Sequence, residues 1–258
     1  MSAWLEGLSP VAQAGLAAMG TWLLTGLGSI PVLFFRQVPR RLMDALMGFA
    51  GGVMVAAACW SLLVPAMAAG GVVRASVGVL SGAALLWALD QVLPHTHPEF
   101  PDEGHREGPR TPWRRSALLM AAITLHNLPE GLAVGVAFGG GELGPALALA
   151  IGIGLQNLPE GLAIALPLRR DGMSRWRALW YGQLSGAVEP VAAVIGAALV
   201  VGSAGLLPYG MGFAAGAMLY VVVEELIPET ERSGNIDVAT IGFIAGFTLM
   251  MALDNALG

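Results

Sequence analysis

Two apolar stretches decide the fold of this chain: SALLMAAITLHNLPEGLAVGVAFG at residues 116–139 and GPALALAIGIGLQNLPEGLAIALPL at residues 144–168. Each is long enough for a helix to cross the hydrocarbon core of a bilayer, which takes about 20 mostly apolar residues. Both are too long and too uniformly apolar to be strands of a membrane barrel. Because only helices and closed barrels satisfy their backbone polar groups in lipid, the two stretches predict membrane-spanning helices.

The composition of the whole chain agrees with a membrane protein. Of its 258 residues 55% are hydrophobic and only 12% are charged, and a soluble domain needs far more charge to cover its surface. Further apolar stretches predict a polytopic all-α bundle of eight transmembrane helices, formed by a single domain over residues 1–258. The predicted helices cover about 10–35, 42–68, 72–93, 116–139, 144–168, 177–202, 206–228 and 236–257.

The basic residues predict the orientation of this bundle in the lipid bilayer. All 13 are arginine, and 12 of them follow the first, third, fifth or seventh predicted helix, whereas Arg74 follows the second. Because loops rich in basic residues stay in the cytoplasm, both termini are expected to be extracytoplasmic. The compact chain with short loops favours a bacterial inner membrane. The longest loop, at about 94–115, is polar and rich in proline, which predicts a flexible cytoplasmic segment.

The two deciding stretches carry the same motif. Asn-Leu-Pro-Glu-Gly-Leu-Ala occupies residues 127–133 and again residues 157–163. The spacing of 30 residues corresponds to one helix and a short turn, so the two copies are expected at the same depth on adjacent antiparallel helices. Transporters often hold their substrate at such repeat interfaces. In each copy a proline predicts a kink or widened turn, and a glycine predicts the close approach of another helix.

Ionisable side chains inside these helices predict a functional site. Glu130 and Glu160 lie mid-helix, where a charge costs several kcal/mol. His126 precedes Glu130 by four residues and Gln156 precedes Glu160 by four, so each pair shares a helical face. Imidazole, carboxylate and amide groups together form a ligand set for zinc, iron or manganese. A bound cation would also neutralise the buried charges.

Three other readings remain open at this point. Chains of Glu and His relay protons, but protons alone leave the amides of Asn127, Gln156 and Asn157 without a role. An intramembrane zinc protease is a second alternative, yet the chain has no His-Glu-x-x-His sequence, so no enzyme is expected. A coupled carrier of an organic solute would have a varied polar lining, whereas these polar groups cluster like metal ligands. No organic cofactor and no nucleic-acid partner is expected.

Through these two motifs, the Glu189-Pro190 pair and the acidic run at 224–230, the chain resembles the ZIP (Zrt/Irt-like) metal transporters, and most closely their prokaryotic GufA-like branch. The resemblance covers nearly the whole chain. It implies uptake of zinc, and often of cadmium, iron or manganese, through a binuclear centre between the fourth, fifth and sixth helices. It also implies an elevator-type motion of the transport helices against a scaffold. Homodimers are common in the family, and the small residues from Gly212 to Gly216 suggest a dimer face.

The resemblance further implies which residues bind the cation. The first site would contain Met54, His126, Glu130, Gln156 and Glu160. The second site would contain Asn127, Glu130, Asn157, Glu160 and Glu189, with the two shared glutamates bridging. Possible exit or regulatory metal ligands are Glu224, Glu225 and Glu229 after the seventh helix, and His95 and His97 in the long loop.

Asn157 gives this chain a feature of its own, because some relatives have Asp at that position. With Asn, the second site offers three carboxylates, a formal charge of −3 against +4 for two divalent cations. We therefore predict a weaker second site that is empty at low metal concentration.

Overall fold

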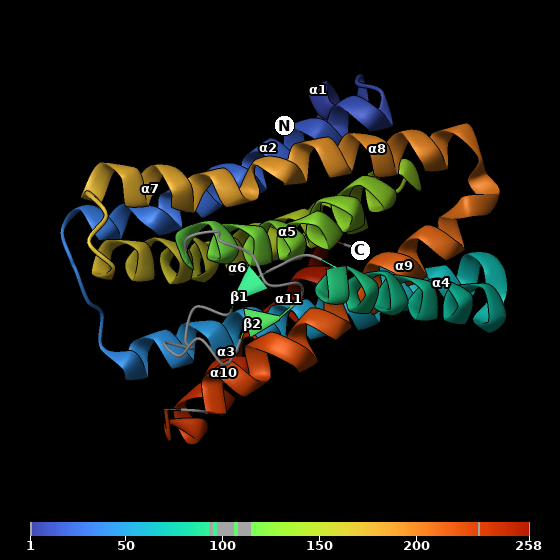
Figure 1. Cartoon of the computed structure of the whole chain (residues 1–258). Helices are drawn as coiled ribbons and strands as arrows, with labels where there is room; N and C mark the ends of the chain where they lie inside the picture. The colour runs from blue at the N-terminus through green and yellow to red at the C-terminus, as the bar shows by residue number, and fades with distance from the viewer. Residues whose placement is uncertain (1, 93–94, 97–105, 108–114, 232, 258) are drawn as a thin grey trace.

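The computed structural model describes residues 2–92, 95–96, 106–107, 115–231 and 233–257, which form a bundle of long helices (Figure 1). The α-helices are α1 (Ser2–Glu6), α2 (Pro10–Ser29), α3 (Arg40–Ala56), α4 (Val64–Val92), α5 (Arg115–Gly139), α6 (Leu143–Arg170), α7 (Arg175–Leu184), α8 (Val188–Gly202), α9 (Leu207–Val221), α10 (Ile227–Glu231) and α11 (Ile236–Leu257). Short 3-10 turns cover Ile30–Leu33, Ser185–Ala187 and Ala204–Leu206, and π-helical turns cover Ala57–Leu63 and Val222–Leu226.

The segment predicted as a flexible loop contains a short antiparallel pairing. Strand β1 (His95–Thr96) pairs with strand β2 (Arg106–Glu107), so that His95 lies opposite Glu107. The sequence did not predict these strands, because two-residue strands have no readable alternation.

Local signals set the limits of several helices. Pro10 is the first residue of α2, where its missing N–H is not needed, and the Ser9 side chain accepts a hydrogen bond from the Ala12 N–H. Gly71 has φ 78° and ψ 163° and interrupts the helical run from Arg40 to Val92. Glycine enters this region without the steric cost of a side chain. The break falls between residues 68 and 72, where the sequence predicted that one helix ends and the next begins.

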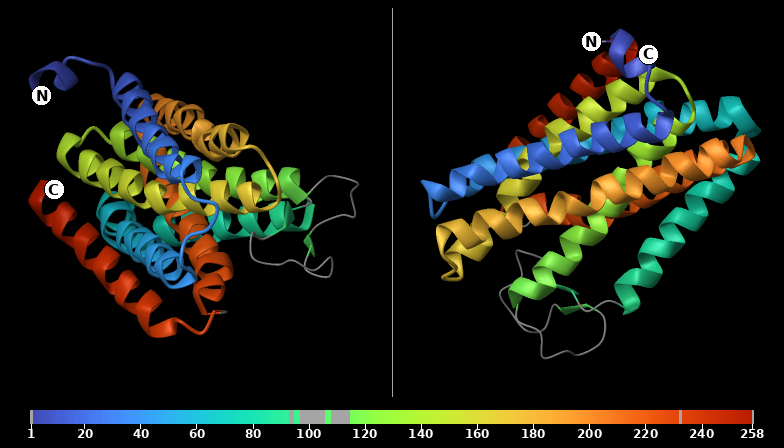
Figure 2. Two further views of the ribbon diagram at one scale, coloured as in Figure 1. Left: turned by 90° about the vertical axis from the view of Figure 1, so that its left-hand side faces the viewer. Right: turned by 90° about the horizontal axis from the view of Figure 1, so that it is seen from above.

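Six helical stretches in the described part of the chain are long and apolar enough to cross a membrane, in agreement with the predicted membrane bundle. One of them is the interrupted run Arg40–Val92. The two chain ends lie on the same side of the bundle in both panels of Figure 2. The count of eight crossings and the extracytoplasmic termini stay predictions. The six stretches are Pro10–Leu33, Arg40–Val92, Leu143–Arg170, Arg175–Gly202, Ala204–Glu231 and Ile236–Leu257.

The helices are arranged in two layers, which Figure 1 shows one above the other. The upper layer contains α2, α5, α6, α7 and α8, with the most extensive contacts between α5 and α8 and between α2 and α6. The lower layer contains α3, α4, α9, α10 and α11, with the most extensive contacts between α4 and α9 and between α3 and α11. Contacts across the layers, such as those of α6 with α3 and of α5 with α9, are less extensive.

The small residues of α9 contact α4 of the same chain. A Cβ atom at Gly212 would lie 2.4 Å from the Ala75 carbonyl oxygen, and one at Gly216 would lie 2.1 Å from the Val79 carbonyl oxygen. The two backbones therefore touch at these glycines. The expectation that this run forms a dimer face is wrong, because the face is already covered within the chain. The homodimer itself stays a prediction from the family resemblance.

Candidate metal centre

The two repeated motifs meet where α5 lies against α6. Asn127 and Glu130 from α5 and Gln156 and Asn157 from α6 are each no more than 1% exposed. The Gln156 Nε2 group donates a hydrogen bond of 2.6 Å to Glu130 Oε1 and lies 3.5 Å from Glu160 Oε1. One amide thus contacts the glutamates of both motifs, so the structure brings the two copies together as the repeat predicted.

Glu189 joins this cluster from the start of α8, where it is fully buried. The Asn157 Nδ2 group donates to Glu189 Oε1 at 3.0 Å and to Oε2 at 3.1 Å, and it lies 3.2 Å from the carbonyl oxygen of Thr21 in α2. The Thr21 hydroxyl makes a short hydrogen bond to Glu189 Oε2. The side of the cluster that Asn157 occupies is therefore held by three helices of the upper layer.

Glycines in the motifs permit these close approaches. A Cβ atom at Gly131 would lie 2.5 Å from the Glu189 carbonyl oxygen, and one at Gly161 would lie 2.0 Å from the Thr25 carbonyl oxygen. This confirms the predicted approach of neighbouring helices. The helices stay α-helical through both motif prolines. The widened turns lie elsewhere, at Ala57–Leu63 and Val222–Leu226.

Several buried polar atoms in this cluster have no hydrogen-bond partner in the described part of the chain. Four of them are oxygens: Asn127 Oδ1, Glu130 Oε2, Gln156 Oε1 and Asn157 Oδ1. Nearly all buried polar atoms in proteins are hydrogen-bonded, and each exception costs about 1–3 kcal/mol. Amide and carboxylate oxygens without protons to accept are suitable ligands for a divalent cation.

His126 lies one turn before Glu130 and contacts the lower layer. Its Nε2 atom makes a short contact with Glu225 Oε1, which comes from the π-helical turn Val222–Leu226. The two side chains are 16% and 13% exposed, so they are more accessible than the buried cluster beside them. Such widened turns are frequent at functional sites. Glu225 was predicted as an exit residue, and its contact with the predicted ligand His126 was not.

The other predicted residues are more dispersed. Met54 is 1% exposed in α3, which packs against α6. Glu224 is exposed next to Glu225, and Glu229 lies further along in α10, with Oε1 3.9 Å from Nη2 of Arg40.

The last two predicted residues are the histidines of the long loop. His95 lies in β1, and His97 falls outside the described residues. Among the residues that the structure describes, no group of three or more His, Cys, Asp or Glu side chains is gathered for a metal ion. In the cluster, the Gln156 amide bridges the carboxylates of Glu130 and Glu160, and the Asn157 amide binds that of Glu189.

The contribution of α2 was missed at the sequence level. Thr21, Thr25 and Ser29 are each no more than 2% exposed, and their spacing of four residues places the three hydroxyls on one helical face. The Ser29 hydroxyl lies 3.0 Å from the Gly161 carbonyl oxygen. A row of hydroxyls in an otherwise apolar helix was the signal that could have revealed this contact.

Known proteins resemble this chain over almost its whole length. A family model described as "ZIP Zinc transporter" matches residues 110–254. The chain is 40% identical to "Zinc transporter ZIP11" of Homo sapiens, over 98% of this chain and 100% of that protein. It is 41% identical to "Zinc transporter GufA" of Myxococcus xanthus, over 95% and 99% of the two chains. It is 40% identical to "Zinc transporter ZIPB" of Bordetella bronchiseptica, over 96% and 82%.

Proposed function

Because the chain belongs to the ZIP family of zinc transporters, in its GufA-like branch, we propose that it carries zinc into the cytoplasm through the cluster between α5, α6 and α8. The family consists of transporters, so the chain is a multi-pass membrane protein with a divalent metal ion as its cargo, and it is not an enzyme. Cadmium, iron and manganese are further proposed cargoes, since the ligand types suit each of them.

The proposed centre is supported by the four buried oxygens that have no hydrogen-bond partner among the described residues. A divalent cation among Asn127, Glu130, Gln156 and Asn157 would satisfy these oxygens and neutralise the Glu130 carboxylate. His126 would become a ligand when it leaves Glu225. The proposed first site contains Met54, His126, Glu130, Gln156 and Glu160, and the proposed weaker second site contains Asn127, Glu130, Asn157, Glu160 and Glu189.

The proposed exit begins at the contact between His126 and Glu225. His126 precedes Glu130 on α5, so it lies toward the end of the bundle where α5 begins and α6 ends at Arg170. This is the end that the arginines predict to be cytoplasmic. Glu225 would take the cation from His126, and Glu224 and Glu229 would lie further along. His95 and His97 remain candidates for handoff or regulation.

We propose an elevator-type motion for the transport step. The ligands of α5, α6 and α8 all belong to the upper layer, whereas Met54 and Glu225 belong to the lower layer. Contacts between the layers are less extensive than those within them, which suits a rigid displacement of one layer against the other. Eight crossings, extracytoplasmic termini, a bacterial inner membrane and a homodimer complete the proposal.

Zinc uptake into proteoliposomes tests this function. Purified wild-type protein should accumulate zinc, and Glu130→Gln, which keeps the shape of the side chain but removes its charge, should reduce uptake at low zinc at least about 10-fold. Glu6→Gln removes an exposed carboxylate far from the cluster and should leave uptake unchanged. Wild-type protein without zinc flux, or Glu130→Gln with normal flux, would contradict the proposal.

A further inference from the structure

A basic cavity of about 620 Å³ lies between the two layers at the end of the bundle where α6 ends. It is lined by the connection from α2 to α3, by residues of α6 beyond Glu160, and by Glu229 of α10. Three arginines face it: Arg36, Arg40 and Arg170. With Glu229 as the one acidic residue of the lining, the formal charge of the lining is +2, which favours an anionic ligand.

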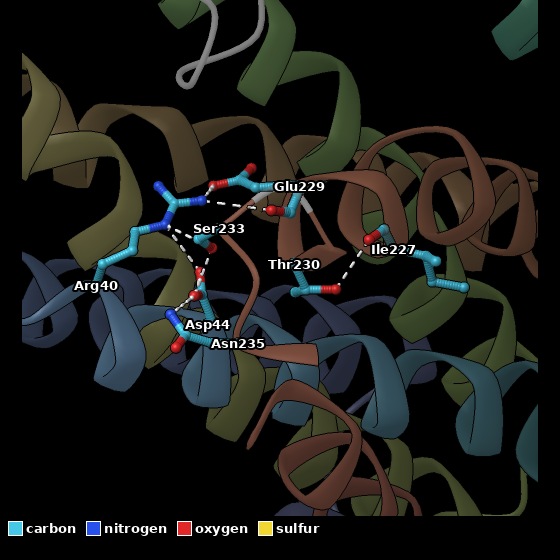
Figure 3. Close-up of polar contacts among 7 residues, drawn as sticks. All are labelled: Arg40, Asp44, Ile227, Glu229, Thr230, Ser233 and Asn235. Atoms are coloured by element: carbon cyan, nitrogen blue, oxygen red, sulfur yellow. Dashed lines mark hydrogen bonds and ion pairs between the residues drawn. The ribbon is translucent and has the colours of Figure 1, made fainter. Parts of the chain in front are cut away.

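One of these arginines is held in place by a buried carboxylate, as Figure 3 shows. The Arg40 Nε atom lies 2.9 Å from Asp44 Oδ1, and its Nη2 group donates to the Glu229 carbonyl oxygen at 3.3 Å. Asp44 is 1% exposed and also accepts hydrogen bonds from Ser233 at 2.5 Å and Asn235 at 2.9 Å. The position of the Arg40 guanidinium is therefore fixed by α3 and by the segment between α10 and α11.

The other two arginines have no hydrogen bond or ion pair to the residues that the structure describes. Arg36 follows the turn at the end of α2, and Arg170 is the last residue of α6, and both are exposed. Beside Arg36, the rings of Phe34 and Phe35 are 77% and 57% exposed. Trp176, at the start of α7 shortly after Arg170, is 61% exposed, and tryptophan at helix ends is typical of the level of the lipid headgroups. The cavity therefore opens at the height where lipid phosphates lie.

We propose that this cavity binds a phosphate group, with an anionic lipid headgroup as the favoured source and free inorganic phosphate as the other. Guanidinium groups bind phosphate oxygens with two parallel hydrogen bonds, and basic pockets between membrane helices bind lipid headgroups on the cytoplasmic side. The bound phosphate would contact Arg170 of the upper layer and Arg40 of the lower layer, and so link the two layers.

Thermal unfolding of the purified full chain in detergent tests this site without relying on transport. Phosphatidylglycerol should raise the unfolding temperature in a saturable way, and phosphatidylcholine should not. The double variant Arg36→Gln/Arg170→Gln should raise the half-saturating phosphatidylglycerol concentration about 30-fold, because each arginine that contacts the bound anionic headgroup contributes about a five-fold factor. Arg74→Gln/Arg177→Gln removes the same charge outside the cavity and should change that concentration less than about three-fold.

The other outcomes of this experiment distinguish a lipid headgroup from free phosphate as the ligand, or overturn the proposed site. Stabilisation by inorganic phosphate, lost in Arg36→Gln/Arg170→Gln, would support the site with free phosphate as its ligand. Equal losses in the two double variants, or no stabilisation by either probe, would overturn it. If Arg36→Gln/Arg170→Gln does not fold, Arg36→Lys/Arg170→Lys keeps the charge and should still weaken binding, because lysine cannot form the paired hydrogen bonds. Zinc binding should be unchanged in each variant, which separates this site from the metal centre.

Discussion

At the scale of single residues, Asn157 holds the Glu189 carboxylate in place and adds no charge of its own to the cluster. Its amide N–H group holds both oxygens of Glu189, and its own oxygen has no partner among the described residues. An aspartate could not donate this hydrogen bond. Without a cation, it would place a second carboxylate against Glu189, which is strongly unfavourable in a buried site.

Asn157→Asp should therefore strengthen the second metal site. We expect the wild-type protein to bind one zinc ion tightly and a second at least about 10-fold more weakly, whereas Asn157→Asp should bind two with similar affinity. Isothermal titration calorimetry, with metal analysis of the purified protein, gives the stoichiometry. Asn255→Asp adds the same charge at an exposed position of α11 and should behave as wild type. Two equally tight zinc ions in the wild type would contradict the assigned role of Asn157.

Thr21 offers a second prediction at this scale, because its hydroxyl contacts the Glu189 carboxylate. Thr21→Val removes the hydroxyl with little change in shape, and it should weaken zinc binding at the second site about 10-fold, as is usual for partners that orient a ligand. Zinc titration of the purified variant measures the effect. Ser29→Ala removes a buried hydroxyl that contacts backbone oxygens only, so its zinc affinity should match that of the wild type. Equal losses in the two variants would show that the effect is not specific to Glu189.

At the scale of the helices, the close approach of α6 to α2 depends on Gly161. Gly161→Ala would place a Cβ atom 2.0 Å from the Thr25 carbonyl oxygen, so the helices must separate and the free energy of unfolding should fall by about 1–3 kcal/mol or more. Thermal unfolding in detergent measures the change. Gly20→Ala is the matched control, since no atom outside its own stretch of α2 lies within 4 Å of the added Cβ among the described residues. It should be neutral or stabilise the protein by up to about 1 kcal/mol. A Gly161→Ala variant as stable as Gly20→Ala would refute this packing.

The helices and the core of the cluster could be predicted because their signals are local. The lengths of the apolar stretches predicted the helix limits within a few residues. The break at Gly71 lies between the second and third predicted helices. The repeated motif predicted that Glu130 and Glu160 come together. The contact of His126 with Glu225 joins residues 99 positions apart, and its partner depends on how the two layers pack. The π-helical turns were missed because one extra residue per turn leaves an apolar run unchanged.

At the scale of the whole molecule, the elevator proposal predicts that joining the two layers stops transport. A Cβ atom at Gly210 of α9 would lie 3.9 Å from the Val136 Cβ atom of α5, a separation suited to a disulfide. In a Cys59→Ser background, Gly210→Cys/Val136→Cys should lose most zinc uptake on oxidation and recover it on reduction. Proteoliposome uptake before and after reduction measures the change.

The control for this experiment is a disulfide within one layer. A Cβ atom at Gly26 of α2 would lie 3.4 Å from the Gln183 Cβ atom of α7, and both helices belong to the upper layer. Oxidised Gly26→Cys/Gln183→Cys should transport zinc as well as its reduced form. Normal zinc uptake by the oxidised Gly210→Cys/Val136→Cys variant would exclude a displacement of one layer against the other.

The antiparallel course of α5 and α6 gives the repeated motif a built-in polarity. The two residues that lie four positions before the glutamates are displaced toward opposite ends of the bundle. His126 lies toward the end with Arg170, and Gln156 lies toward the turn between the two helices. A cation moving along the pair therefore meets a neutral amide on one approach and an ionisable imidazole, paired with Glu225, on the other. Two nearly identical sequences thus form a passage whose two directions are chemically unequal.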